Sequence, residues 1–256
     1  MPRYFLELSY KGTKYSGFQV QRHTVTIQSE VERALNILFS SAMGNKPGFE
    51  LTGSSRTDAG VHALQNYFHF DADMEISSQR LYNLNAILPK DIVAKRIIPV
   101  KADAHCRFDA ISRVYKYYVY QEKSPFLDDR AFYYPFKLDQ DVLQKAADLL
   151  KGYTNFASFS KRNTQVKTFE CKIIRSEWNY ENGCFVYNVE ANRFLRGMVR
   201  GLVGTMLKVA RSSWSLTDFT SIIEAKDCTK ADFSTPPHGL FLAAVKYPAG
   251  QFNEEV

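Results

Sequence analysis

Long apolar runs are missing from this chain. Nowhere in its 256 residues do about 18 apolar residues stand together, which is the length that a membrane-spanning helix requires. The opening residues MPRYFLELSY also lack the basic region, the apolar run and the small-residue cleavage site of a secretory leader. Since both signals are missing, we expect a soluble, cytoplasmic protein with no membrane partner.

Cysteine is scarce. The four cysteines, Cys106, Cys171, Cys184 and Cys228, are too scattered for a Cys-x-x-Cys metal site and too few to staple a chain of this length. The five histidines are scattered in the same way and show no ligand cluster. We therefore expect reduced cysteines that mostly serve packing.

Apolar and aromatic residues are plentiful by contrast. Apolar residues make up 45% of the chain and aromatic residues 14%, which is enough for the core of one large domain or two small ones. Lys and Arg number 33 against 27 Asp and Glu, for a net charge of +6 and a pI of about 9.0. This excess fits a polyanionic partner, although many ordinary basic enzymes share it.

Periodicity in the first hundred residues predicts the element order β-α-β-β-α-β. The expected elements are a strand over 3–10, a helix from Ile27 capped by Thr26, a short strand near 49–52, a strand over 61–70, a helix capped by Ser77 or Ser78 and stopped by Pro89, and a strand over about 92–98. This order is the split βαβ unit of ferredoxin-like folds.

The second half repeats that order with one extra helix. The expected elements are an alternating strand over 111–121, a helix capped by Asp139 and ended by Gly152, a hairpin of 168–180 and 184–191 turned at Asn182-Gly183, a long helix from Arg193, a shorter one from about Leu216, and a strand over 240–247. No residue-level repeat is visible, so the duplication is inferred from element order alone. We predict an α+β fold of two similar halves, 1–105 and 106–256, each an antiparallel sheet with helices on one face and the other face available to form a cleft.

A polar loop before the strand over 61–70 carries the most chemistry. In Arg56-Thr57-Asp58-Ala59-Gly60 a carboxylate is flanked by small residues, so that a ligand can approach Asp58 closely. A neighbouring cation would keep this carboxylate ionised, as a nucleophile or a general base requires. The alternative is that Asp58 only caps a turn, as Asp near Gly often does.

The stretch 193–211 predicts an amphipathic helix with a cationic edge. At about 100° per residue, five basic residues share one stripe, with three glycines on or beside it: Arg193, Arg196, Arg200, Lys208 and Arg211, and Gly197, Gly201 and Gly204. Glycine there lets something approach the helix backbone closely. Two interpretations stay open, a ligand that approaches the cationic edge closely, or tight packing of the glycines with the arginines solvated.

Five stretches together resemble one family. They are YKGTKYSGFQVQ followed by Thr26-Ile27-Gln28, then RTDAGVHA, HCRFDAISRVYKY, FLRGMVRGLVGTML and, more weakly, PPHGLFL. In this order they resemble the tRNA pseudouridine synthases that modify positions 38, 39 and 40 of the anticodon arm. The resemblance covers nearly the whole chain. It implies two pseudo-repeated halves forming a basic cleft, a homodimer, tRNA as the partner, and isomerisation of uridine to pseudouridine without a metal or other cofactor.

The resemblance also assigns roles to residues. Asp58 matches the catalytic aspartate, Arg56 the arginine that occupies the space of the flipped base, Tyr115 the tyrosine that stacks on the target uracil, and Arg200 the arginine that pairs with the aspartate. Arg193 and Arg196 have no partner assigned and would contact phosphate if they face the RNA. For His62 we expect a core or strand-face position.

The chain departs from the family pattern at three positions. Leu64 and Asn66 stand where the family more often has Gly and a small apolar residue, and Cys106 where it often has Ala. These changes leave the catalytic set intact, and we expect them to alter only local packing.

Two other functions remain to be separated from this one. A non-catalytic RNA-binding module would suit paired ferredoxin-like sheets with exposed tyrosines, but it would not need Asp58 beside the binding aromatic. A hydrolase of N-glycosidic bonds would use Asp58, but such an enzyme usually needs a second carboxylate, and the motif supplies none.

Overall fold

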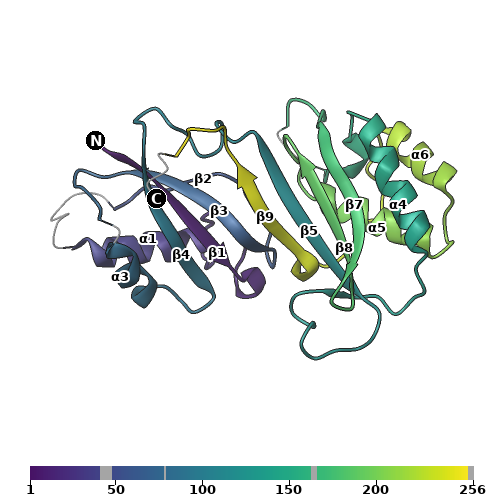
Figure 1. The fold of residues 1–256 in the computed structure, drawn as a ribbon, viewed down its shortest axis with the longest axis horizontal. Helices are drawn as coiled ribbons and strands as arrows, with labels where there is room; N and C mark the ends of the chain where they lie inside the picture. The colour runs from purple at the N-terminus through teal and green to yellow at the C-terminus, as the bar shows by residue number, and fades with distance from the viewer. Residues whose placement is uncertain (41–47, 78, 163–165, 253–256) are drawn as a thin grey trace. The chain divides into compact units, whose positions relative to one another are not determined.

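The computed structural model describes residues 1–40, 48–77, 79–162 and 166–252. The chain forms two compact units, Met1–Ile111 with Leu242–Val256, and Ser112–Phe241 (Figure 1). The predicted α+β class is confirmed. These compact units divide the chain after residue 111 and after residue 241. The proposal that halves 1–105 and 106–256 repeat the same fold stays a prediction.

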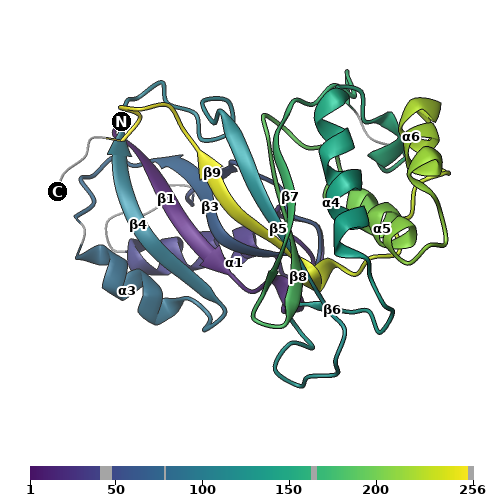
Figure 2. The ribbon, with the colours of Figure 1, turned by 45° about the vertical axis from the view of Figure 1, so that its right-hand side comes forward.

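The first unit is built on a sheet in the order β4-β1-β3-β9, in which β1 is antiparallel to both β4 and β3, and the short β2 is also paired antiparallel to β3. Its strands are β1 (Arg3–Tyr10), β2 (Thr52–Gly53), β3 (His62–Asp71), β4 (Ile92–Val100) and β9 (Leu240–Lys246), of which residues 242–246 belong to this unit. The helices α1 (Ile27–Leu38) and α3 (Arg80–Ile87) lie on one side of this sheet (Figures 1 and 2). The order β4-β1-β3-β2 is the one expected for a split βαβ unit.

Local sequence signals account for most of the first unit. Thr26 caps α1 as predicted, and it forms a capping box with Ser29. Both faces of β1 are covered, because the neighbouring residues Phe5 and Leu6, which point to opposite faces, are both fully buried. The C-terminal segment returns to this core, because the Tyr247 ring lies 5.6 Å from the Phe5 ring, between centroids.

The second unit holds a sheet in the order β5-β8-β7, all antiparallel, with β6 parallel to β5. Its elements are β5 (Ser112–Tyr120), β6 (Phe132–Tyr133), α4 (Gln140–Leu149), β7 (Ile173–Glu181), β8 (Cys184–Ala191), α5 (Met198–Ala210) and α6 (Leu216–Ala225). The three helices cover one face of this sheet (Figures 1 and 2). The predicted hairpin is confirmed, because Asn182 and Gly183 both have positive φ, 50° and 78°, as a tight turn between β7 and β8 requires.

Helix α5 begins later than predicted. Gly197 precedes it with φ of 76°, a left-handed conformation that interrupts the helical path, so the regular helix starts at Met198 rather than Arg193. Arg193 and Arg196 therefore lie outside α5. The predicted stripe of five basic residues on one helix is wrong, because the pattern alone did not reveal the left-handed glycine.

Smaller differences concern element ends. The helix predicted after Ser77 or Ser78 begins at Arg80, and its N-cap position, Gln79, makes no side-chain capping bond. Ser77 contributes only its backbone carbonyl, which accepts from the Arg80 amide, and Ser78 lies outside the described residues. The strand predicted near 49–52 is reduced to β2. No helix in the described ranges is long and apolar enough to cross a membrane.

Candidate functional site

Asp58 lies in the loop that joins β2 to β3. The loop leaves β2 with the Ser54 amide donating to the Tyr67 carbonyl at 2.8 Å, and it ends in a turn where the Val61 amide donates to the Asp58 carbonyl at 3.1 Å. Gly60 supplies the positive φ of 78° that this turn needs. Asp58 itself is half-buried, and it sits on a short loop held at both ends by the sheet.

A network of buried hydrogen bonds fixes the loop from the side of the sheet. Asn66 is fully buried in β3 and donates through Nδ2 to the Ser55 carbonyl at 2.8 Å and to the Tyr10 hydroxyl at 3.1 Å. The Tyr10 hydroxyl in turn lies 2.8 Å from Thr57 Oγ1, next to Asp58. The expectation that Asn66 alters only local packing is therefore corrected. It joins two strands to the loop that carries the aspartate.

The segment after β1 supports the same loop from behind. The Phe18 amide donates to the Thr57 carbonyl at 3.1 Å, and Gly17 has a φ of 103°. A Cβ on Gly17 would lie 3.1 Å from the Thr57 carbonyl oxygen and 3.4 Å from the Ala59 amide nitrogen. Because Gly17 has no Cβ, its segment can pack closely against residues 57–59 and so help to hold the aspartate in position.

Gly12 makes a second close contact at the end of the loop. Its amide donates to His62 Nδ1 at 3.0 Å, and a Cβ there would lie only 2.0 Å from the Val61 carbonyl oxygen. His62 is 1% exposed, so the predicted core position is confirmed. The histidine anchors a backbone turn from inside the core.

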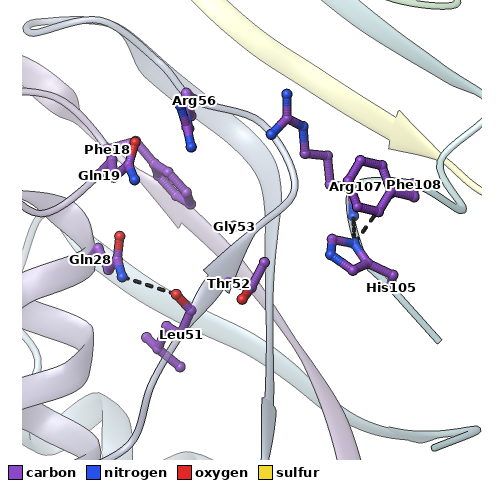
Figure 3. Close-up of a pocket in the computed structure, with 10 residues that line it drawn as sticks. All are labelled: Phe18, Gln19, Gln28, Leu51, Thr52, Gly53, Arg56, His105, Arg107 and Phe108. Atoms are coloured by element: carbon purple, nitrogen blue, oxygen red, sulfur yellow. Dashed lines mark hydrogen bonds between the residues drawn. The ribbon is translucent and has the colours of Figure 1, made fainter. Parts of the chain in front are cut away.

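Arg56 borders a pocket of about 220 Å³ (Figure 3). The side chain is exposed, and among the described residues none accepts a hydrogen bond from its guanidinium. Other residues of the lining are Phe18, Gln28, His105, Arg107 and Phe108, all from the first unit. This side chain is therefore available to a ligand that approaches the Asp58 loop.

Tyr115 lies in β5 of the second unit, where it pairs with Val189 of β8. Its side chain is 9% exposed and packs edge-on against Phe194, with the ring centroids 4.9 Å apart and the planes at 81°. Phe194 was not singled out from the sequence beyond its place in a family motif. It holds the Tyr115 ring in one orientation, which a stacking surface requires.

Arg200 lies in the first turn of α5 and is clamped to a following loop. Its Nε donates to the Thr235 carbonyl at 2.7 Å, and the Thr235 hydroxyl donates back to the Arg200 carbonyl at 2.9 Å. Close by, the Tyr117 hydroxyl donates to the Pro236 carbonyl at 2.7 Å, and burial raises the pKa of this phenol far above its usual range. The first bond holds the guanidinium, and the second holds the Arg200 backbone against the same loop.

The glycines of α5 serve this same packing. A Cβ on Gly204 would lie 2.3 Å from the Asp232 carbonyl oxygen, and one on Gly201 would lie 2.8 Å from the Phe233 ring. The close approach predicted from these glycines is therefore real, but the approaching group is the chain's own loop. The packing interpretation is confirmed for both positions.

The predicted site residues fall into two groups. Arg56 and Asp58 share one loop of the first unit, whereas Tyr115, Arg200 and the pair Arg193 and Arg196 belong to the second unit. Arg193 is half-buried and Arg196 exposed, and the Arg196 carbonyl accepts from the Lys161 amide at 3.0 Å.

One cluster of potential metal ligands was missed in the sequence. The ligand atoms of His69, His105 and Cys106 all lie within 4.8 Å of one another, because β3 brings residue 69 beside the turn at 105–106. Cys106 Sγ donates to the Thr52 carbonyl at 3.1 Å, and the Cys106 amide donates to His69 Nδ1 at 3.2 Å. Burial, followed by the charge of His105, lowers the pKa of His69 to about 4. The structure corrects the expectation of fully scattered ligands, and the hydrogen bonds give the cluster a structural role. All four cysteines are free thiols.

Comparisons with known proteins agree with this architecture. A family model described as tRNA pseudouridine synthase matches residues 8–109 and 146–248. A protein named tRNA pseudouridine synthase A from Azobacteroides pseudotrichonymphae is 41% identical over 249 residues, covering 97% of this chain and 98% of the relative. Proteins of the same name from Parabacteroides distasonis, 42% identical over 100% of both chains, and Staphylococcus aureus, 34% identical over 95% of this chain and 91% of the relative, are also similar.

Proposed function

The chain belongs to the tRNA pseudouridine synthase family and is an isomerase of tRNA uridines, and from this premise we propose that it acts at positions 38, 39 and 40 of the anticodon arm with Asp58 as the catalytic carboxylate. The observation that carries this proposal is the way the Asp58 loop is built. Thr57 is held by Tyr10 from the sheet and by the Phe18 amide from behind. A carboxylate fixed on a short loop of this kind is suited to chemistry rather than to core packing.

The reaction itself explains why a carboxylate is needed. The bond between N1 of uracil and C1′ of the ribose breaks, the base rotates, and a bond from C5 to C1′ forms. The proton on C5 is lost and N1 gains one, so that atoms and electrons balance without an oxidant or reductant. A base stacked in a helix is inaccessible to this chemistry, so the nucleotide is first flipped out. Asp58 attacks the sugar or the base, or takes a proton.

Tyr115 and Arg200 complete the proposed catalytic set. The Tyr115 ring stacks on the detached uracil and keeps it from escaping, an interaction worth about 1–3 kcal/mol per base, and its hydroxyl is the group best suited to move the C5 proton. Arg200 pairs with the carboxylate and keeps it ionised in a partly dry pocket. Support comes from Phe194 and Thr235, which restrict the two side chains within the second unit.

Three further arginines are proposed to bind the RNA. Arg56 occupies the space that the flipped base leaves, and its exposed guanidinium supports this role. Arg193 and Arg196 contact phosphate, each adding roughly one unit to the salt dependence of affinity. We also propose that the enzyme is a cytoplasmic homodimer. Light scattering on the purified full chain tests whether it is a dimer.

The catalytic proposal is tested with tRNA labelled with tritium at C5 of uridine. Wild-type enzyme should release tritium and leave pseudouridine in the RNA, whereas Asp58→Asn should release none while binding tRNA with near wild-type affinity. The matched control is Asp103→Asn, because Asp103 is an exposed carboxylate of the same unit. A rate for Asp58→Asn within about tenfold of the wild-type rate would remove Asp58 from the chemical step.

The same experiment separates the two other functions. A hydrolase of N-glycosidic bonds would release free uracil, which chromatography of the reaction mixture detects. A non-catalytic binding module would retain the tritium entirely, and the family to which the chain belongs speaks against it.

A further inference from the structure

The pocket beside Arg56 has an unusual lining for a surface hollow. Two arginines, Arg56 and Arg107, lie along the same edge of it, and the described residues of its lining include no carboxylate (Figure 3). The Arg56 guanidinium, from which no described residue accepts a hydrogen bond, gives the hollow a positive local potential, which favours an anionic ligand. Arginine in particular pairs with phosphate through its planar fork of donors.

An exposed aromatic ring stands beside Arg107 in the pocket lining (Figure 3). Phe108 is 74% exposed although phenylalanine is usually buried, and the Arg107 guanidinium carbon lies 5.7 Å from the centroid of its ring. The His105 ring packs behind it at 4.2 Å between centroids. A phenyl ring with one supported side and one open side is a platform on which a base can stack.

The turn that carries this ring is rigid. The amides of Arg107 and Phe108 both donate to His105 Nδ1, at 3.1 and 3.3 Å, and the His105 amide donates to Asp109 Oδ2 at 2.8 Å. Cys106, in the middle of the turn, is fully buried. Phe108 is therefore held outward by its own backbone, so that presenting the ring to a ligand requires little further ordering.

The pocket size limits the occupant. Its volume of about 220 Å³ is smaller than the ~300–1,000 Å³ of typical small-molecule sites, so it accommodates a single small group rather than a helix or a peptide. The Gln28 amide, which donates to Glu32 Oε1 at 2.8 Å and to the Leu51 carbonyl at 3.0 Å, forms a fixed polar wall. One flat heterocycle with polar edges fits such a space.

We propose that this pocket binds one unpaired nucleotide of the tRNA other than the target uridine, with its base on the Phe108 ring and its phosphate on Arg107. This inference rests on the proposed function, because Arg56 forms part of the lining and also enters the space left by the target base. The bound nucleotide is therefore a near neighbour of the target in the RNA chain. The pocket helps to choose which uridine of the arm reaches Asp58, since holding the neighbour sets the register of the strand.

Binding is measured with anticodon arms in which 2-aminopurine replaces the unpaired nucleotides one at a time. Stacking quenches this base, so with wild-type protein one position should lose fluorescence on binding. Phe108→Ala should abolish that quenching and weaken the affinity for the arm roughly five- to hundredfold. Phe108→Tyr, which keeps the ring, should restore both. Arg107→Ala should lower the salt dependence of affinity by about one unit of slope.

The matched controls are Tyr82→Ala and Arg80→Ala in α3. Tyr82 is 80% exposed and belongs to the same unit, but neither residue lines the pocket. Both control variants should behave as wild type. The inference is overturned if Phe108→Ala binds within twofold of Tyr82→Ala, or if the quenching at every position survives the Phe108→Ala change. Pseudouridine formation by the wild-type protein is scored separately, so that a failure of the proposed function is distinguished from a failure of the pocket.

Discussion

Adding one methyl group at Gly12 should damage both stability and turnover. Gly12 is buried in the 3₁₀ helix Gly12–Lys14 after β1, and a Cβ there would lie 2.0 Å from the Val61 carbonyl oxygen and 2.8 Å from the Val61 carbonyl carbon. Both atoms belong to the backbone, so no side-chain rotation relieves the contact. Since unstrained heavy atoms stay about 3.5 Å apart, the two segments must separate by more than about 1 Å.

The expected cost follows from what the displaced segment holds. Overpacking of a core costs about 1–3 kcal/mol, and a backbone obstruction places Gly12→Ala at the upper end of that range. Because the Val61 amide bonds the Asp58 carbonyl, the movement of Val61 is passed to the turn that carries the carboxylate. A misplacement of about 1 Å in a catalytic group lowers the rate by roughly a hundredfold.

Two measurements on one preparation test this reasoning. Urea denaturation gives the free energy of unfolding, and tritium release under single-turnover conditions gives the rate of the chemical step. The control is Gly152→Ala, because a Cβ on Gly152 meets nothing within 4 Å, and we expect its unfolding free energy to change by no more than about 0.5 kcal/mol. Equal stability and equal rates for the two variants would refute the assignment of Gly12 as a spacer behind the Asp58 turn.

Three other predictions concern Asn66, Tyr115 and His69. Asn66→Ala should lower the unfolding free energy by about 1–3 kcal/mol and slow the chemical step, because it leaves the buried Ser55 carbonyl without that donor; an unchanged rate would separate the network from the Asp58 loop. Tyr115→Phe should keep tRNA affinity and lose turnover, because stacking needs only the ring; full activity would leave only the stacking role. For His69, the unfolded chain takes up a proton below a pH of about 6.5 while the folded chain resists protonation down to a pH of about 4. The free energy of unfolding should therefore fall as the pH drops through that interval, and His69→Gln, measured by urea denaturation at pH 7 and pH 5, should lose less than the wild type.

Local sequence signals predicted the elements whose causes are local. Thr26, followed by apolar residues at helical spacing, predicted the start of α1, and Asn182-Gly183 predicted the β7–β8 turn. A helix cap and a tight turn each depend on only a few consecutive residues. The start of α5 was missed because helical periodicity continues through Gly197, whose left-handed φ depends on the tertiary setting.

Features that join distant segments were beyond the sequence. Asn66 was recognised only as a departure from the family pattern, because its partner Tyr10 lies 56 residues away in β1. The contact of His69 with Cys106 spans 37 residues and depends on strand register in the same way. The aspartate loop could be identified from its motif, whereas the groups that hold it became visible only with the sheet in place.

The chain leaves the first unit at residue 111 and returns to it at residue 242. During synthesis at about 5–20 residues per second, the unit that carries Asp58 waits roughly 7–26 s for its last strand. In that interval β3 has no β9 beside it, and Phe5 and Tyr67 lack the rings of Tyr247 and Phe252. A nascent chain at this stage exposes a sheet edge and an aromatic surface to the ribosome exit and to chaperones. Messages truncated before residue 242 would therefore yield a protein whose second unit is nearly finished while its first unit is an aggregation hazard.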